Sequence, residues 1–144
     1  MIDGVGNKMK PKLLEKLIKK IQKEIDQSRI EKVDAERKID QLNIRLQNLK
    51  DDLVKEQVVT SENVEFRHTY ENFYKTNKTR QVNIGEEIKR LEGVVAEIEE
   101  LLFEQFRTFK QYEILLNRYL QAQKDRIESE ESKFLDELGI RRAG

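Results

Sequence analysis

The chain has 144 residues, of which 28 are basic, 28 are acidic and one is histidine, so its formal net charge is zero. Charged residues make up 39% and apolar residues 37%, with six glycines and one proline. Soluble globular domains carry about 25% charged and roughly 45–50% apolar residues. This composition excludes a thick hydrophobic core and a loop-rich fold, and it favours a protein built of long helices.

The same numbers exclude several classes of function. A balanced charge is not typical of a dedicated nucleic-acid binder, which is strongly basic. Because the chain has no cysteine, it has no disulfide, no thiolate nucleophile and no cysteine metal site. The first residues lack the apolar stretch of a signal peptide, and no apolar run is long enough to enter a membrane. We therefore expect a cytoplasmic protein without a cofactor and without direct membrane insertion.

The first half of the chain predicts one long helix. Residues 1–10 have no apolar periodicity and are expected to be a disordered arm, whereas Pro11 suits the first turn of a helix. From residue 14, seam positions follow in alternating steps of four and three, the repeat of a left-handed coiled coil. The pattern predicts helix 1 over about 12–57. The seam positions are Leu14, Ile18, Ile21, Ile25, Ser28, Lys32, Ala35, Ile39, Leu42, Leu46, Leu49 and Leu53.

The second half repeats the pattern after a predicted turn at about 58–63. Apolar spacing restarts by Tyr70, which predicts helix 2 over about 64–138 and a tail over 139–144 beginning with a capping Gly139. Beyond the seam the stripe shifts to Leu120, Ile127, Phe134 and Leu138. The seam positions of this half are Ile84, Ile88, Leu91, Val95, Ile98, Leu102, Gln105, Phe109, Tyr112, Leu116 and Tyr119.

Two seams joined by a short turn predict that the helices pack on each other. The expected fold is all-α: a long antiparallel two-helix coiled coil, or helical hairpin, that forms one domain over 11–138. Helix 2 is the longer, so its carboxyl-terminal end cannot bury its apolar stripe against helix 1. An exposed amphipathic stripe of this kind indicates a surface for a partner.

Reactive groups are scarce. His68 is the only histidine, no phosphate-binding loop is present, and adjacent acids such as Glu99 and Glu100 point to different angles of a helix. We therefore predict that the protein is not an enzyme.

Within the seams, Ser28, Lys32 and Gln105 are polar, and such residues either fix the register of a coiled coil or are merely tolerated. Gly85 and Gly93 weaken helix 2, and whether they bend it stays open.

Charge is unevenly distributed. Residues 8–23 contain seven lysines and one glutamate, whereas residues 86–104 contain seven glutamates and two basic residues. In a hairpin that turns near residue 61 we expect these segments to overlap in height. Neutralisation inside the hairpin is one interpretation, and a basic surface for an acidic partner, centred on Lys16 and Lys20, is the other.

All aromatic residues lie in the second half, mostly in two clusters. Phe66, Tyr70 and Phe73 follow the turn, and Phe66 and Phe73 are expected to flank the seam. In the second cluster Phe106 is expected to flank the seam and Phe103 to face outward. Local packing and a docking surface are alternative interpretations of both clusters.

The carboxyl-terminal half also carries a resemblance to a known family. The stretch Lys110-Gln111-Tyr112-Glu113-Ile114-Leu115, a charged helix, and then Phe134-Leu135-Asp136-Glu137-Leu138 before Arg141-Arg142 resembles the FliJ family of soluble flagellar export proteins, whose injectisome counterpart is YscO. The Thr60-Ser61 turn and the aromatic start of helix 2 at Tyr70-Glu71-Asn72-Phe73 are similar to that family as well.

The resemblance implies a non-enzymatic stalk of a flagellar type III protein export apparatus, inserted in the hexameric export ATPase. It also implies links to the membrane export gate, FlhA, and to export chaperones, with an expected place at the cytoplasmic face of the inner membrane. Phe73 matches the family aromatic that contacts the gate, with Tyr70 beside it and Phe66 near. This chain departs from the family patch at Asn77, Arg80 and Ile84. The expected surfaces for the ATPase ring or another protein are Lys16, Lys20, Phe103, Phe106, Leu135, Asp136, Glu137, Arg141 and Arg142.

A structural scaffold is the alternative function. Such a coiled coil would form a stable dimer or tetramer without an ATPase partner, whereas the stalk is expected to be a monomer when alone.

Overall fold

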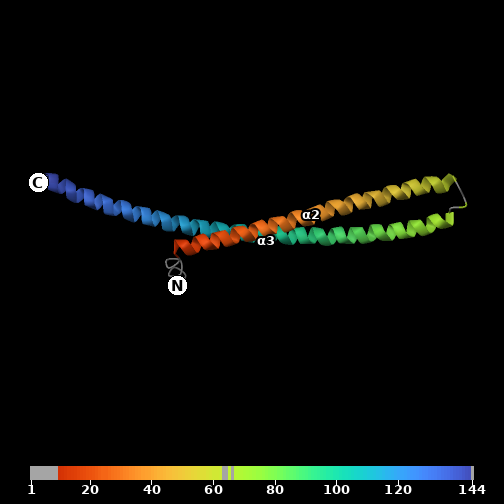
Figure 1. Cartoon of the computed structure of the whole chain (residues 1–144), viewed down its shortest axis with the longest axis horizontal. Helices are drawn as coiled ribbons and strands as arrows, with labels where there is room; N and C mark the ends of the chain where they lie inside the picture. Colours follow the sequence, from red (N-terminus) through yellow and green to blue (C-terminus); the bar gives the residue numbers. More distant parts are fainter. Residues whose placement is uncertain (1–9, 63–64, 66, 144) are drawn as a thin grey trace. The chain divides into compact units, whose positions relative to one another are not determined.

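The structure, a computed structural model, describes residues 10–62, 65 and 67–143, except for the side chains of 61, 62 and 140–143. It contains two long helices, α2 over Pro11–Glu62 with 52 residues and α3 over Arg67–Ala143 with 77 residues (Figure 1). The described residues contain no strand. Helix 2 of the prediction is therefore α3, and it is the longer of the two.

Both helices extend further than the sequence predicts. α2 continues to Glu62, so residues 58–62 of the predicted turn are helical, and α3 runs through Gly139 to Ala143 instead of ending at 138. β-Branched and small polar residues cost a helix less than about 1 kcal/mol each, and one glycine costs about 1 kcal/mol. These costs are too small to stop a long helix. The expected disordered arm falls almost entirely on residues 1–9, which lie outside the described residues.

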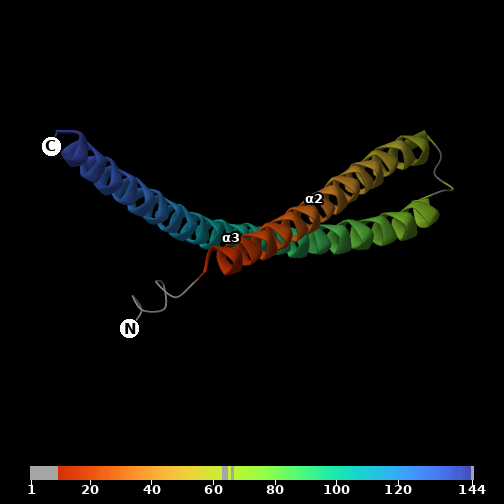
Figure 2. The same cartoon turned by 60° about the vertical axis from the view of Figure 1, so that its left-hand side comes forward.

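The helices pack in two contact units. Unit 1 comprises Met1–Asp26 and Phe103–Gly144, and unit 2 comprises Gln27–Leu102. Within unit 2, Asn77 is hydrogen-bonded to Leu49 and Lys32 is paired with Glu99, so the partner number on α3 rises as the number on α2 falls. The two helices of unit 2 are therefore antiparallel and lie side by side (Figures 1 and 2). The predicted fold class, a two-helix antiparallel coiled coil, is confirmed.

The predicted seams supply the core. Every one of the twelve seam positions of the first half and the eleven of the second is buried or half-buried. Leu14 is buried almost completely, and Leu102 is 8% exposed while its neighbour Leu101 is 47% exposed. Burying a leucine contributes roughly 1.5–3 kcal/mol relative to leaving it exposed. The repeat of alternating four- and three-residue steps thus holds the helices together.

The polar seam residues behave differently from one another. Ser28 and Gln105 are buried, and no hydrogen-bond partner for Oε1 of Gln105 is present among the described residues. The Lys32 side chain is half-buried, and its Nζ lies 3.4 Å from Oε1 of Glu99 on the other helix. Lys32 therefore keeps its stem in the seam and its charge at the edge. The register role of these residues stays a prediction.

Asn77 is a polar seam residue that the sequence analysis did not identify. It is only 3% exposed, and its Nδ2 donates a 2.9 Å hydrogen bond to the main-chain oxygen of Leu49 on α2. Its Oδ1 accepts a 2.7 Å hydrogen bond from Nε2 of Gln81. Steps of four and three taken backwards from Ile84 reach residues 81 and 77, so the repeat contains a signal for both.

Candidate partner-binding surfaces

The turn end of the hairpin carries the first predicted surface. On α3, Tyr70 is half-buried and Phe73 is 37% exposed. The rings of Tyr70 and Tyr74 lie 6.1 Å apart, and the Lys78 ammonium lies 5.5 Å from the centre of the Tyr74 ring. Phe66 lies outside the described residues. The structure thus brings Tyr70 and Phe73 together at an accessible position one turn apart.

α2 contributes to the same surface, which the sequence analysis missed. A hollow at this end is lined by three residues of each helix, and Val59 of α2 is half exposed. Residues 58–63 were expected to form a turn, so no surface was predicted there. We call this hollow the turn-end hollow, and its lining residues are Glu56, Val59, Thr60, Thr69, Tyr70 and Phe73.

Three positions at which the sequence departs from the family patch have different surroundings. Asn77 and Ile84 are buried in the seam, whereas Arg80 is exposed. The accessible apolar surface of α3 therefore does not continue from Phe73 along these positions. At this end it extends sideways to Val59 of α2 instead.

The second predicted surface is the lysine-rich start of α2. Lys12, Lys16, Lys19 and Lys23 repeat the spacing of Leu14, Ile18, Ile21 and Ile25 two residues earlier, which places the lysines on the side of the helix opposite the seam. These lysines and Lys20 are all exposed. Within the described residues none of the five forms an ion pair. We call this set the lysine face.

Both interpretations of the uneven charge stay predictions. Within the described residues no ion pair joins the lysine face to a glutamate of residues 86–104. Of these glutamates, Glu99 is paired with Lys32 of α2, and Glu87 is paired with Arg90 of its own helix. Neutralisation inside the hairpin and a basic surface for an acidic partner are therefore both left open.

Two rings of the second aromatic cluster are exposed to different degrees. Phe103 is 67% exposed and Phe106 is 42% exposed. The Arg107 guanidinium lies 5.9 Å from the centre of the Phe103 ring, which keeps one face of that ring against a cation. Phe103 thus faces outward, Phe106 is less exposed, and the role of both in binding stays a prediction.

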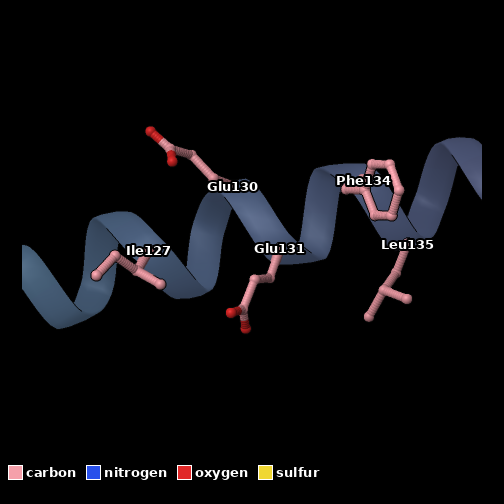
Figure 3. Close-up of a pocket in the computed structure, with 5 residues that line it drawn as sticks. All are labelled: Ile127, Glu130, Glu131, Phe134 and Leu135. Atoms are coloured by element: carbon pink, nitrogen blue, oxygen red, sulfur yellow. The ribbon is translucent and has the colours of Figure 1, made fainter.

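The carboxyl-terminal part of α3 carries the third surface. After Tyr119 every described side chain is exposed except Gln123 and Leu138. Ile127, Phe134 and Leu135 form a surface hollow with Glu130 and Glu131, and Leu135 is 64% exposed. Figure 3 shows that all five come from one helix, with Glu131 and Leu135 on one side and Glu130 on the other. We call residues 120–138 the exposed stripe.

The remaining predicted residues of this end are placed only in part. Asp136 and Glu137 are exposed within the exposed stripe. Arg141 and Arg142 belong to α3, but their side chains lie outside the described residues. The structure therefore brings Leu135, Asp136 and Glu137 to one accessible segment.

The described residues contain no group of three or more histidine, cysteine or acidic side chains that could hold a metal ion. Neither helix has, within those residues, a stretch long and apolar enough to cross a membrane.

Comparison with known proteins identifies the family. The sequence model of FliJ, described as "Flagellar FliJ protein", matches residues 9–144. The chain belongs to the FliJ family. Neither the curated proteins nor the solved structures compared with it include a match. Membership in the FliJ family makes the chain a component of the flagellar protein export apparatus, and this family is non-catalytic.

Proposed function

We propose that the chain is a non-catalytic stalk and adaptor that inserts in the hexameric export ATPase and links it to the export gate and to export chaperones. The observation that carries the proposal is the unequal length of the helices, 52 and 77 residues, in a member of the FliJ family. The paired part supplies a stiff coiled coil, and the exposed stripe supplies an amphipathic helix for a partner. The expected location is the cytoplasm, peripheral to the cytoplasmic face of the inner membrane.

The action on the ATPase requires unequal binding. A symmetric ring has several equivalent interfaces, and a stalk changes their behaviour only if it binds their states with different affinity. A hairpin with a lysine face on one helix and an exposed stripe on the other presents different chemistry on different sides. It therefore has the asymmetry that such a role needs, without any bond chemistry of its own.

The test is the effect on the cognate ATPase. Adding the chain is expected to promote hexamer formation, measured by light scattering, and to raise the rate of ATP hydrolysis. The variant Phe134→Ser with Leu135→Ser removes two exposed apolar side chains and is expected to lose most of that stimulation. The matched variant Glu128→Gln with Ser129→Ala changes the same segment without touching its apolar residues. No stimulation at saturating wild-type chain would contradict the proposal.

The lysine face is the proposed contact with an acidic surface of the ring or of another protein. Charge reversal by Lys16→Glu with Lys20→Glu is expected to leave the helix content unchanged, because both side chains are exposed. The same variant is expected to capture much less of the ATPase. The binding that remains is expected to depend less on salt concentration than that of the wild-type chain. Charge reversal at Lys50 and Lys89, two exposed lysines outside the proposed surfaces, is the matched control.

The turn-end hollow is the proposed contact with the gate. Phe73→Ala is expected to weaken binding to the detergent-solubilised cognate gate protein by tenfold or more, as large aromatic anchors at interfaces do. Tyr74→Ala is the matched control, since Tyr74 does not line the hollow. Equal losses in the two variants would contradict this assignment.

Light scattering of the chain alone separates the stalk from the alternative function of a structural scaffold. The stalk is expected to be a monomer, whereas a scaffold would be a dimer or tetramer.

A further inference from the structure

A second hollow of unit 2 is lined by polar side chains, and it includes Arg80 and Ile84, two positions at which the sequence departs from the family patch. Arg45 and Asn48 of α2 and Arg80 and Asn83 of α3 line it, with Leu49 and Ile84 as its floor. Leu49 and Ile84 are seam residues, half-buried and buried, while the four polar residues are exposed. Two guanidinium groups and two side-chain amides from opposite helices thus share one opening.

The two arginines have no acidic partner among the described residues, as is also true of the lysine face. Basic and acidic residues are equally numerous in the sequence. Within the described residues, however, neither Arg45 nor Arg80 forms an ion pair. The helical neighbours three and four residues away contain no carboxylate either. Those neighbours are Gln41, Leu42, Asn48 and Leu49 around Arg45, and Thr76, Asn77, Asn83 and Ile84 around Arg80.

This arrangement selects an anion of a particular shape. Guanidinium groups present planar forks of N–H donors that bind a carboxylate through two parallel hydrogen bonds. The asparagine side chains add N–H donors and no charge. Two cations that line one opening also repel each other, and a bound anion removes that repulsion.

We infer that this hollow is a binding site for a side-chain carboxylate of an acidic protein segment, held by Arg45 and Arg80 together. A carboxylate is the anion that a protein partner supplies, and the chain is a component of a protein export apparatus. The floor of Leu49 and Ile84 receives the methylene groups of a glutamate, while the forks take its oxygens. Neither the lysine face nor the turn-end hollow shares a residue with this site.

The register of the two helices holds the site open. Asn77 donates its hydrogen bond to the oxygen of Leu49, which lies on the floor of the hollow. Asn77 precedes Arg80 by three residues on α3, and Leu49 follows Arg45 by four on α2, so each arginine lies one turn from this contact. The hydrogen bond therefore fixes which arginine of α2 faces which arginine of α3.

The test uses the full chain and a tetraglutamate peptide as the probe, followed by NMR of the arginine Nε–H and asparagine side-chain groups at constant ionic strength. The signals of Arg45, Arg80, Asn48 and Asn83 are expected to shift together along one binding curve. Arg45→Gln and Arg80→Gln are each expected to weaken binding about tenfold, the effect of losing one charge-assisted hydrogen-bonded pair. Arg45→Lys keeps the charge but loses the fork, so it is expected to weaken binding as well.

The controls separate a defined site from general attraction to a cationic surface. Arg37→Gln removes the same charge from an exposed position of α2 and is expected to leave the affinity unchanged. An equal loss in Arg37→Gln, or a shift of only one of the two arginines, would overturn the inference. Tighter binding of inorganic phosphate than of the peptide would also overturn it, since the site would then prefer a phosphate group. None of these results depends on whether the chain stimulates the ATPase.

Discussion

The side-chain amide of Asn77 donates a 2.9 Å hydrogen bond to the main-chain oxygen of Leu49, and this bond ties α3 to the backbone of α2. Most contacts of a coiled coil are between apolar side chains, which tolerate a slip of one heptad. A hydrogen bond from a buried side chain to one particular carbonyl does not tolerate such a slip, because the donor would lose its acceptor. The contact therefore distinguishes the observed register of unit 2 from its neighbours.

Removal of this amide is expected to destabilise the hairpin. Asn77→Ala removes the donor and leaves a space in the seam, so the free energy of unfolding is expected to fall by about 1–3 kcal/mol in urea denaturation. Asn77→Asp keeps the shape but has no N–H donor and would bury a charge, so its loss is expected to be at least as large. Thr76→Ala, at the exposed neighbouring position, is the control and is expected to change the free energy by less than about 0.5 kcal/mol.

A neighbouring pair of leucines offers a direct test of the seam. Leu102 is 8% exposed and Leu101 is 47% exposed. Leu102→Ala is expected to lower the free energy of unfolding by about 2–5 kcal/mol, whereas Leu101→Ala is expected to lower it by less than about 1 kcal/mol. Thermal or urea unfolding followed by circular dichroism measures both. Equal losses would mean that α3 is rotated about its axis from the orientation described.

Gly93 is expected to be a position at which a substitution raises the stability of the chain. It lies inside α3, and no atom lies within 4 Å of the position that an added Cβ would occupy. Gly93→Ala is expected to stabilise the chain by up to about 1 kcal/mol, because alanine is the better helix former. The measurement is the urea midpoint at an unchanged m-value. A loss of stability would show that the glycine serves a bend of the helix.

Glu87 is expected to titrate below its usual range. A hydrogen bond from Arg90 lowers the pKa of Glu87 from its usual 4.5, and the charges of Arg90 and of Lys38 on α2 act in the same direction. A group whose pKa is lowered by folding stabilises the fold above its unfolded pKa, and this contribution disappears as the pH falls through the lowered pKa. The loss is thus expected only in the acid range below 4.5.

Carbon-detected NMR of the Glu87 carboxyl during an acid titration checks this expectation. Arg90→Gln removes the donor and is expected to raise the midpoint towards that of an ordinary glutamate. Arg107→Gln, which removes a charge that lies over the Phe103 ring, is the control. A Glu87 midpoint that is the same in the wild-type chain and in Arg90→Gln would contradict the assigned cause.

Much of the fold could be predicted because one physical requirement dominates it. A seam such as Leu14 to Leu53 must repeat every 3.5 residues on average. The spacing of the apolar residues therefore predicts both that a seam exists and which residues form it. The ends of the helices were harder to predict. Thr60 and Ser61 can cap a helix or continue one at little cost, and the sequence contains no signal strong enough to separate these outcomes.

The candidate sites were predictable only where they depend on one helix. The lysine face and the exposed stripe follow from the period of a single helix, and both were found. The turn-end hollow and the arginine site each need residues of two helices, such as Arg45 and Arg80. Their pairing depends on the register, and the apolar repeat alone permits several registers. The hydrogen bond of Asn77 lies outside what that repeat encodes.

The antiparallel course of unit 2 also has a consequence for how the chain acquires its structure. The bond between Asn77 and Leu49 spans 28 residues, while the ion pair between Lys32 and Glu99 closes a much longer stretch of chain. The entropy lost on closing a loop grows with its length. The contacts between the two helices should therefore form first beside the turn and then in order of increasing distance from it. During synthesis on the ribosome, the end that carries Tyr70 and Phe73 would consequently pair first, before the seam residues at the start of α2 have a partner helix to pack against.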